Sequence, residues 1–413
     1  MNQKALNPAL YAARLGLAIT LAFGGAAAQA QTVVNVAGLA DFTGPYADIM
    51  KDLTGCRAAV LSWWNAEVGK DMNVTLRVKD YDTRYDTAQT ASLWPGIKSE
   101  LNPVAVLGIG GPDVAALRER LPTDKIPSFL ATAAYAFGWQ PDQWYFHPRP
   151  TYPHEAGAFF EWYKATKNDG KPFKIGVISS EASPAYTDIH KGIAQYAKEN
   201  PGTVDLVETI YTEVQPVDLS TQVARLVRKG VDVIYVGTNT AAIVATKRAL
   251  QGLGKANIPL VMSAHNGLPA SGKALGDIKQ LEGSFEVYAM AVPADADTET
   301  RKFFQMLQAE HKLNASFSLP CLMGMSSSLV FVRAFEGAAK NAGNVNITGE
   351  DIRNYLISSP ISSKQTFGVT GDLNYTAQAP FPMSGLTVNI ATVKDGKHVI
   401  VESGAAVPQL NKW

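Results

Sequence analysis

At 413 residues the chain exceeds the usual size of one domain, and two domains of ordinary size are expected. Hydrophobic residues make up 46% of the chain and charged residues 18%, a composition typical of globular proteins, which excludes a largely disordered chain. Lys and Arg total 37, as do Asp and Glu, so the chain has no net positive field with which to hold a nucleic-acid backbone. We therefore expect a small-molecule partner and no nucleic acid.

Residues 1–30 have the features of a secretory signal peptide. Lys4 and Arg14 supply positive charge, residues 15–25 are mostly apolar, and Ala28-Gln29-Ala30 matches the small-x-small cleavage pattern. A transmembrane anchor is the alternative, but the apolar stretch is shorter than the roughly 20 residues that cross a bilayer. The sequence predicts cleavage near Ala30 and a soluble exported protein, with no cysteine at the cleavage point to carry a lipid.

Short β-branched runs alternate with segments of helical period from residue 33 onward, which is typical of parallel βαβ units. In the first series we predict strands at 33–40, 73–80, 104–108 and 126–131, and helices at 46–68, 86–100 and 113–121. Residues 138–153 are rich in proline and aromatic residues and predict an irregular first crossing between two lobes.

The alternation restarts after this crossing. We predict strands at 173–180, 203–211, 231–237 and 258–264, and helices near 186–199, 218–229 and 239–253. These strands are apolar on both faces, as strands covered by helices on each side must be. The last part predicts helices at 298–312, 322–342 and 349–357, then strands at 373–381 and 386–401 with a hairpin turn at Lys394-Asp395-Gly396-Lys397.

Two similar α/β halves predict a two-lobed α/β fold, in which each lobe is a parallel sheet flanked by helices and a hinged cleft lies between. The expected lobe 1 spans 31–152 and 292–375, and lobe 2 spans 153–291 and 376–413. The two cysteines are Cys56 and Cys321. An oxidising compartment permits a disulfide between them, and two separately buried thiols are the alternative that we favour.

Catalytic and metal-binding motifs are incomplete in this chain. Residues 267–274 approach the phosphate-binding loop G-x-x-x-x-G-K-[ST], but Ala274 lacks the hydroxyl that holds magnesium. His154-Glu155 begins like a zinc-protease helix, but Ala158 stands where the second histidine is required. We therefore expect no enzymatic activity, no metal and no cofactor.

Six loops follow predicted strands at their carboxyl ends, where open α/β sheets bind ligands. They mix glycine, small hydroxyls, amides and tyrosines, which suits the reversible holding of a solute. Ordinary turn chemistry is the alternative for each loop alone. The loops are 43–46, 108–112, 132–135, 183–186, 237–239 and 264–267.

The order and spacing of several segments resemble the Leu/Ile/Val-binding family, the type I periplasmic solute receptors of ABC importers. The segments are VAGLADFTGPYAD, KDYDTRYDTAQTA, VAVLGIGG, IPSFLATAAYA, KIGVISSEASPAYTDIHKGI and VDVIYVGTNTAAIVATKRALQGLG. The resemblance covers essentially the whole mature chain. It implies a periplasmic protein that closes on a solute and presents the closed form to ABC permease subunits of the inner membrane; we expect a monomer.

The resemblance also implies the residues that hold the ligand. A ligand carboxylate is expected at Gly111 and at the turn of Thr132, Ala133 and Ala134, on N–H groups near helix N-termini. The other implied site residues are aromatic or amide side chains around the same cleft. They are Tyr46, Tyr135, Tyr186, Asn239 and Asn266.

Two departures from the family bear on the ligand. Asn266 stands where amino-acid binders carry an acidic side chain for the substrate ammonium, and the crossing near Tyr152 lacks the carboxylate often found there. We therefore expect an aromatic carboxylate first, with stacking on Tyr135, Trp139 and Tyr152, and a branched-chain amino acid second. An amide or urea receptor and an exported sensory receptor are the alternatives. For the stacking aromatics a structural role at the lobe junction is the alternative, and for Arg149 we favour a hinge-bracing salt bridge over a carboxylate clamp.

Overall fold

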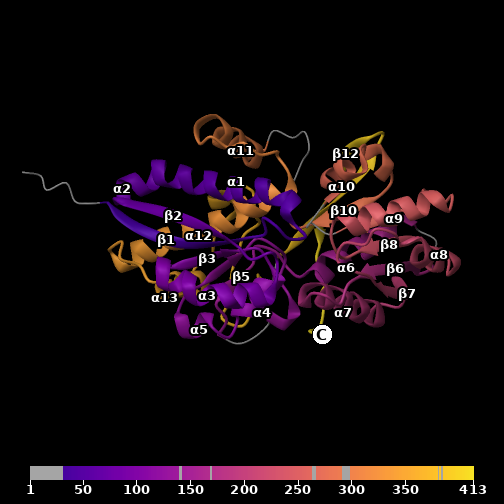
Figure 1. The fold of residues 1–413 in the computed structure, drawn as a ribbon, viewed down its shortest axis with the longest axis horizontal. Coiled ribbons are helices and arrows are strands. Elements are labelled where there is room, and N and C mark those ends of the chain that lie inside the picture. Colours follow the sequence, from indigo (N-terminus) through magenta and orange to yellow (C-terminus); the bar gives the residue numbers. More distant parts are fainter. Residues whose placement is uncertain are drawn as a thin grey trace, which may run out of the picture.

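The computed structural model describes residues 31–138, 142–167, 170–262, 267–290, 298–379, 381–382 and 385–413. Two β-sheets with their flanking helices form two lobes that lie side by side (Figure 1). In the part of the chain thus described, the helices lack the length and apolar character that crossing a membrane demands. The predicted signal peptide at 1–30 lies outside the described residues.

The first lobe is built on a parallel sheet with the strand order β2-β1-β3-β4-β5. Its strands are β1 (Thr32–Ala40), β2 (Val74–Asp82), β3 (Ala105–Gly108), β4 (Ser128–Leu130) and β5 (Tyr145–Phe146). Helices α1 (Ala47–Trp64) and α12 (Leu319–Ala342) pack on one face, and α3 (Thr87–Leu101) and α4 (Gly111–Leu117) on the other. The remaining helices of this lobe are α2 (Lys70–Met72), α5 (Leu121–Asp124), α11 (Glu299–Glu310) and α13 (Gly349–Ser358).

The second lobe is built on a sheet with the order β12-β11-β10-β9-β8-β6-β7. Its strands are β6 (Phe173–Ser179), β7 (Val204–Tyr211), β8 (Val233–Val236), β9 (Leu260–Met262), β10 (Phe285–Tyr288), β11 (Thr387–Lys394) and β12 (Lys397–Ala406). Helices α6 (Tyr152–Lys167) and α7 (Pro184–Glu199) cover one face, and α8 (Ser220–Arg228), α9 (Thr240–Gly252) and α10 (Gly267–Leu275) the other. The pairs β10–β11 and β11–β12 are antiparallel, and the other pairs are parallel.

These sheets confirm the predicted α/β class with two helix-flanked lobes. The predicted C-terminal hairpin is present as β11 and β12, with Asp395 and Gly396 at positive φ in the turn. Two local predictions are wrong. Of the predicted strand 373–381, residues 373, 376 and 379 form isolated bridges instead, and the proline-rich segment 138–153 contains β5 and the start of α6.

The chain passes from one lobe to the other three times, and these crossings define the hinge between the lobes. They follow β5, follow β10 and precede β11. Helices α11 to α13 return to the first lobe, where α12 packs across the first sheet. We propose the lobe boundaries at these three crossings.

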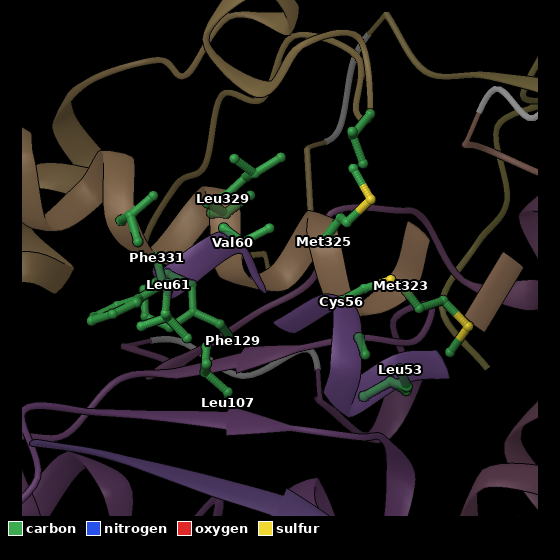
Figure 2. Close-up of a cluster of buried hydrophobic side chains, with 14 of the residues drawn as sticks. Leu53, Cys56, Val60, Leu61, Leu107, Phe129, Met323, Met325, Leu329 and Phe331 are labelled. Carbon is green, nitrogen blue, oxygen red and sulfur yellow. The ribbon is translucent and has the colours of Figure 1, made fainter. Parts of the chain in front are cut away.

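The core of the first lobe lies between its sheet and the crossed helices α1 and α12, as Figure 2 shows. Leu107 and Phe129 rise from the strands, and the ring of Phe129 lies 5.4 Å from that of Phe331 on α12. On the same face Cys56 of α1 and Cys321 of α12 form a disulfide with a Cα–Cα distance of 5.2 Å. The expectation of two separate thiols is therefore wrong, because the packing of α1 on α12 brings together residues that are 265 positions apart.

Asp113 on α4 is buried beneath the loop that ends β3. Its carboxylate accepts hydrogen bonds from the N–H groups of Ile109 (2.7 Å) and Gly110 (3.2 Å). Burial nevertheless raises the pKa of Asp113 to about 6 from 3.8. Because the folded-state pKa is above the unfolded one, the ionised carboxylate destabilises the fold above pH 6, and this loss disappears as the pH falls from about 6 to about 4.

This linkage predicts how stability responds to pH in an Asp113→Asn variant. The free energy of unfolding of the wild type, relative to that of the variant, should rise by about 2–3 kcal/mol between about pH 7 and about pH 4. Urea denaturation at several pH values measures the difference, with Asp205→Asn at an exposed position of β7 as the control. A constant difference between wild type and Asp113→Asn over this range would contradict the prediction.

Candidate functional site

Five tyrosines from both lobes gather where the two lobes meet. They come from the N-terminal ends of α1, α6 and α7 and from two loops of the first lobe, and none is more than 7% exposed. The hydroxyl of Tyr46 in the first lobe is hydrogen-bonded to the hydroxyl of Tyr186 in the second. The lobes are thus closed on one another at this junction. The five are Tyr46, Tyr85, Tyr135, Tyr152 and Tyr186.

The loop that carries Tyr46 is held by Asp41, the residue after β1. The carboxylate of Asp41 accepts hydrogen bonds from the N–H groups of Gly44 (2.5 Å) and Tyr46 (2.8 Å). A Cβ on Gly44 would lie 2.4 Å from an Asp41 oxygen and 2.5 Å from the carbonyl oxygen of Arg84, so the turn requires glycine. This turn places Tyr46 at the start of α1, facing the second lobe.

Tyr85 is a residue of the junction that we did not predict. It lies in the loop after β2, and its ring centroid is 4.6 Å from that of Tyr46. Both Arg84 (φ 55°) and Tyr85 (φ 53°) have left-handed backbone conformations, which residues other than glycine seldom adopt. Strain of this kind is stored preferentially at functional sites. The sequence offers no signal for it, because both residue types also occur in ordinary turns.

The carboxylate-holding residues expected in the first lobe differ in what they present to the junction. The amide of Gly111 and the hydroxyl of Thr132 both contact Tyr135, and the amide of Ala133 contacts Tyr152. Burial raises the pKa of Tyr135 to about 12, and the contacts with Thr132 and Gly111 oppose the rise. In contrast, the N–H groups of Thr132 and Ala134 donate to backbone carbonyls. Two amides and one hydroxyl therefore face the tyrosines.

A hydrogen bond from His147 fixes the orientation of the turn that contains Thr132. Its Nδ1 lies 3.0 Å from the carbonyl oxygen of Thr132, and because a carbonyl only accepts, Nδ1 carries the proton. Burial lowers the pKa of His147 to about 3, so the ring stays neutral at ordinary pH. The hydroxyl of Tyr375 donates to the carbonyl oxygen of His147 (2.9 Å), which ties this turn to the later part of the first lobe.

A carboxylate of the second lobe also fastens the two lobes together. Asp188 on α7 accepts hydrogen bonds from the N–H groups of Ala136 (3.0 and 3.1 Å) and Phe137 (3.3 Å). On the far side of the junction, the hydroxyl of Thr240 donates to Asp48 (3.3 Å). These contacts connect α7 and α9 directly to loops and helices of the first lobe, so closure buries the tyrosines.

The predicted second-lobe residues are only partly placed at the site. Tyr186 lies at the junction, as described above. Asn239 is buried, and its side-chain oxygen caps α9 by accepting from the N–H of Ala242 (3.3 Å). Asn266 and Trp139 lie outside the described residues, so the structure gives no contacts for them.

Arg149 forms the hinge-bracing ion pair that the sequence predicted. Its Nε donates to Glu155 Oε1 (2.9 Å), its Nη2 pairs with Glu155 Oε2, and both side chains are buried. Glu155 also accepts from the N–H of Ala289 (3.1 Å), which joins the first crossing to the second. The expectation that the crossing near Tyr152 lacks a carboxylate is therefore wrong, because α6 begins at Tyr152 and turns Glu155 inward.

A surface pocket of about 550 Å³ opens on the outer side of the Asp188 contact. Arg118 and Phe137 line it from the first lobe, and Lys191 and Trp413 from the second.

Within the described ranges, no three His, Cys, Asp or Glu side chains come together as a metal site would require. The phosphate-loop-like segment 267–274 forms nearly all of helix α10 and is not a phosphate-binding turn. The chemistry of the junction is thus phenolic and amide hydrogen bonding.

The tight contact between Gly111 and the second lobe gives a direct test of closure. A Cβ on Gly111 would lie 2.4 Å from the Cβ of Ala185. We expect Gly111→Ala to hold the lobes apart and to weaken the binding of any ligand that requires closure about 10-fold or more. Calorimetry measures the affinity, and Gly96→Ala on α3, with open space around its added carbon, is the matched control. Equal affinities of the two variants would contradict this assignment of Gly111.

Comparison with known proteins agrees with this architecture. The family model for periplasmic binding proteins matches residues 33–397. A search of curated proteins finds no match. A branched-chain amino acid ABC transporter protein from Thermus thermophilus with bound valine has a TM-score of 0.77 and 16% identity, covering 90% of this chain and 96% of that one.

Two further solved structures have the same fold. A fatty acid ABC transporter substrate-binding protein from Thermomonospora curvata has a TM-score of 0.74 and 20% identity, covering 92% of this chain and 93% of that one. A solute-binding protein from R. palustris in complex with 4-hydroxybenzoate has a TM-score of 0.69 and 15% identity, covering 90% and 96%. The chain belongs to the type I periplasmic binding protein family.

Proposed function

We propose that this protein is the periplasmic substrate-binding protein of an ABC importer, which captures a small carboxylate-bearing solute between its lobes. The observation that carries the proposal is the buried tyrosine junction, in which the hydroxyls of Tyr135 and Tyr152 lie next to the amides of Gly111 and Ala133. A ligand carboxylate accepts hydrogen bonds more strongly than a phenol and would replace those hydroxyls when it binds. Closure around it is the population shift typical of two-lobed receptors.

The chemistry of the junction favours an aromatic carboxylate over an amino acid. Asp41, Glu155 and Asp188, the buried carboxylates described at the junction, already accept hydrogen bonds from backbone N–H groups or from Arg149. A buried ammonium needs a carboxylate partner, and these three are engaged. Tyrosine rings on both sides offer stacking for a ligand ring. A branched-chain amino acid is the second candidate, and among proteins of this fold one holds valine and another 4-hydroxybenzoate.

The remaining expectations from the sequence belong to the same proposal. The ligand-binding residues are proposed to be Tyr46, Gly111, Thr132, Ala133, Ala134, Tyr135, Tyr186, Asn239 and Asn266. We propose that the protein is exported with cleavage near Ala30, acts as a monomer without a cofactor, and carries out no reaction on its ligand. Its macromolecular partners would be the permease subunits that receive the closed form.

A thermal-shift screen of the mature protein tests the ligand class. Benzoate and 4-hydroxybenzoate should raise the melting temperature, because a ligand at 100 times its Kd stabilises the folded state by about 2.7 kcal/mol. Leucine, isoleucine and valine should give smaller shifts. Mass spectrometry of the bound solute should recover it unchanged. A large shift with leucine and none with either aromatic acid would overturn the proposed ligand.

A further inference from the structure

Two hydrogen-bond donors are buried at the hinge end of the junction without a partner among the described residues. They are Arg149 Nη1 and Tyr235 Oη, and both side chains are 0% exposed. Buried polar atoms in proteins are nearly always hydrogen-bonded, and an unmade bond of this kind is costly. Two such atoms close to a ligand site point to a partner supplied from outside the chain.

The surroundings of the two donors connect them to the tyrosine junction. The guanidinium of Arg149 lies 5.2 Å from the ring centroid of Tyr152, whose ring is 6.1 Å from that of Tyr135. Tyr235 on β8 belongs to the same buried cluster as Tyr135 and Tyr152. Arg149 and Glu155 both act electrostatically on the Tyr235 hydroxyl. Arg149 therefore lies against the Tyr152 ring, and the Tyr235 hydroxyl lies near the Arg149–Glu155 pair, beside the buried tyrosines of the junction.

Charge decides which acceptor suits this end. Burial opposes the charge of both partners and raises the pKa of Glu155, but the Glu155 carboxylate also raises the pKa of Arg149, so the guanidinium stays charged with Glu155 as its counter-ion. A second carboxylate here would add an uncompensated buried charge, which is expensive. An uncharged oxygen would accept from both donors without that penalty. An apolar group would leave both donors unpaired.

We propose that Arg149 Nη1 and Tyr235 Oη recognise a second, uncharged oxygen at the end of the ligand opposite its carboxylate. The ligand class is then an aromatic acid with a carbonyl or hydroxyl oxygen para to the carboxylate. The inference rests on the proposed function and narrows its ligand. It assigns Tyr235 as a specificity-determining residue of the second lobe.

Calorimetric titration with a matched set of benzoates tests the inference. The probes are benzoate, 4-methylbenzoate, which has a similar shape without the oxygen, 4-hydroxybenzoate and 4-formylbenzoate. The wild type should bind 4-formylbenzoate about 10-fold or more tightly than 4-methylbenzoate. In Tyr235→Phe this ratio should fall below about 3-fold, and circular dichroism checks that the variant is folded. The control is Tyr196→Phe, which removes a hydroxyl that donates to Glu161 (3.3 Å) instead. This variant should keep the wild-type ratio.

The outcomes separate this inference from the proposed function. If benzoate binds but the 4-formyl and 4-methyl compounds bind equally well, the second-oxygen inference is overturned and the aromatic-acid receptor stands. An unchanged ratio in Tyr235→Phe likewise overturns the role of Tyr235. If none of the four benzoates binds, the proposed ligand class itself fails, and the inference fails with it.

Discussion

Replacing Glu155 with glutamine is expected to lower the free energy of unfolding by about 3–5 kcal/mol. Glu155 is 1% exposed and Arg149 0% exposed, so the variant leaves a guanidinium charge buried without its counter-ion. The glutamine oxygen still accepts from the N–H of Ala289, but the hydrogen bond from Arg149 Nη2 is lost with the charge, because the amide nitrogen that replaces Oε2 cannot accept. Urea denaturation at neutral pH measures the change.

Two further variants show whether the stability lost in Glu155→Gln comes from the unpaired charge of Arg149. Glu100→Gln breaks the exposed ion pair with Lys79, in which both side chains are 48% exposed, and should cost much less stability than Glu155→Gln. Replacing both partners together, Arg149→Met with Glu155→Leu, should recover most of the stability, because no charge is then left unpaired. If Glu155→Gln lowered the free energy of unfolding as little as Glu100→Gln, the predicted contribution of the buried ion pair would be contradicted.

Removal of the disulfide is the second change with a large expected effect. Cys56 and Cys321 enclose a loop of 265 residues in sequence, so the crosslink restricts the unfolded chain over more than half its length. The variant with both Cys56→Ala and Cys321→Ala should lose about 2–5 kcal/mol of unfolding free energy. A reducing agent should lower the stability of the wild type by a similar amount and leave the double variant unchanged.

Thiol counting provides the decisive control for the disulfide. Denatured wild-type protein prepared without reductant should contain no reactive thiol, and reduction should release both. Recovery of two free thiols before reduction would show that the bond does not form. A disulfide of this kind is consistent with export, because such bonds persist in oxidising compartments.

The sequence was sufficient to predict most of the elements that form the two sheets. Continuous apolar runs such as 173–180 and 231–237 match β6 and β8 closely, because strands covered on both faces need apolar residues throughout. The loops after these strands were identified for the same reason. Since the strands of an open α/β sheet end at one edge, a strand prediction also places its loop at the ligand-binding edge.

The features that the sequence did not reveal depend on how distant segments meet. The disulfide depends on the separation of two helices, and the pairing of Glu155 with Arg149 depends on where α6 begins within a proline-rich segment. The left-handed backbone of Tyr85 is set by its loop and has no signature in residue type. Tyr235 reads as an ordinary core strand residue, and only its hydroxyl's lack of a partner among the described residues distinguishes it.

The closed junction also explains how binding and closure are coupled. The Tyr46 and Tyr186 hydroxyls contact one another, and Asp188 holds loop amides of the opposite lobe. These contacts form only when the lobes meet. They therefore stabilise the closed state in addition to any stabilisation that the ligand supplies. A ligand that bridges Thr132 and Tyr235 would gain interactions from both lobes at once, which is the differential affinity that a population shift requires.

Small-angle X-ray scattering with and without a saturating ligand tests the central claim most directly. With an aromatic acid whose binding calorimetry has verified, the radius of gyration should decrease and the curve should match the closed arrangement in Figure 1. Gly111→Ala should keep the larger radius at the same ligand concentration. Identical scattering of the wild type with and without the bound acid would contradict the account, because the ligand would then bind without bringing the lobes together.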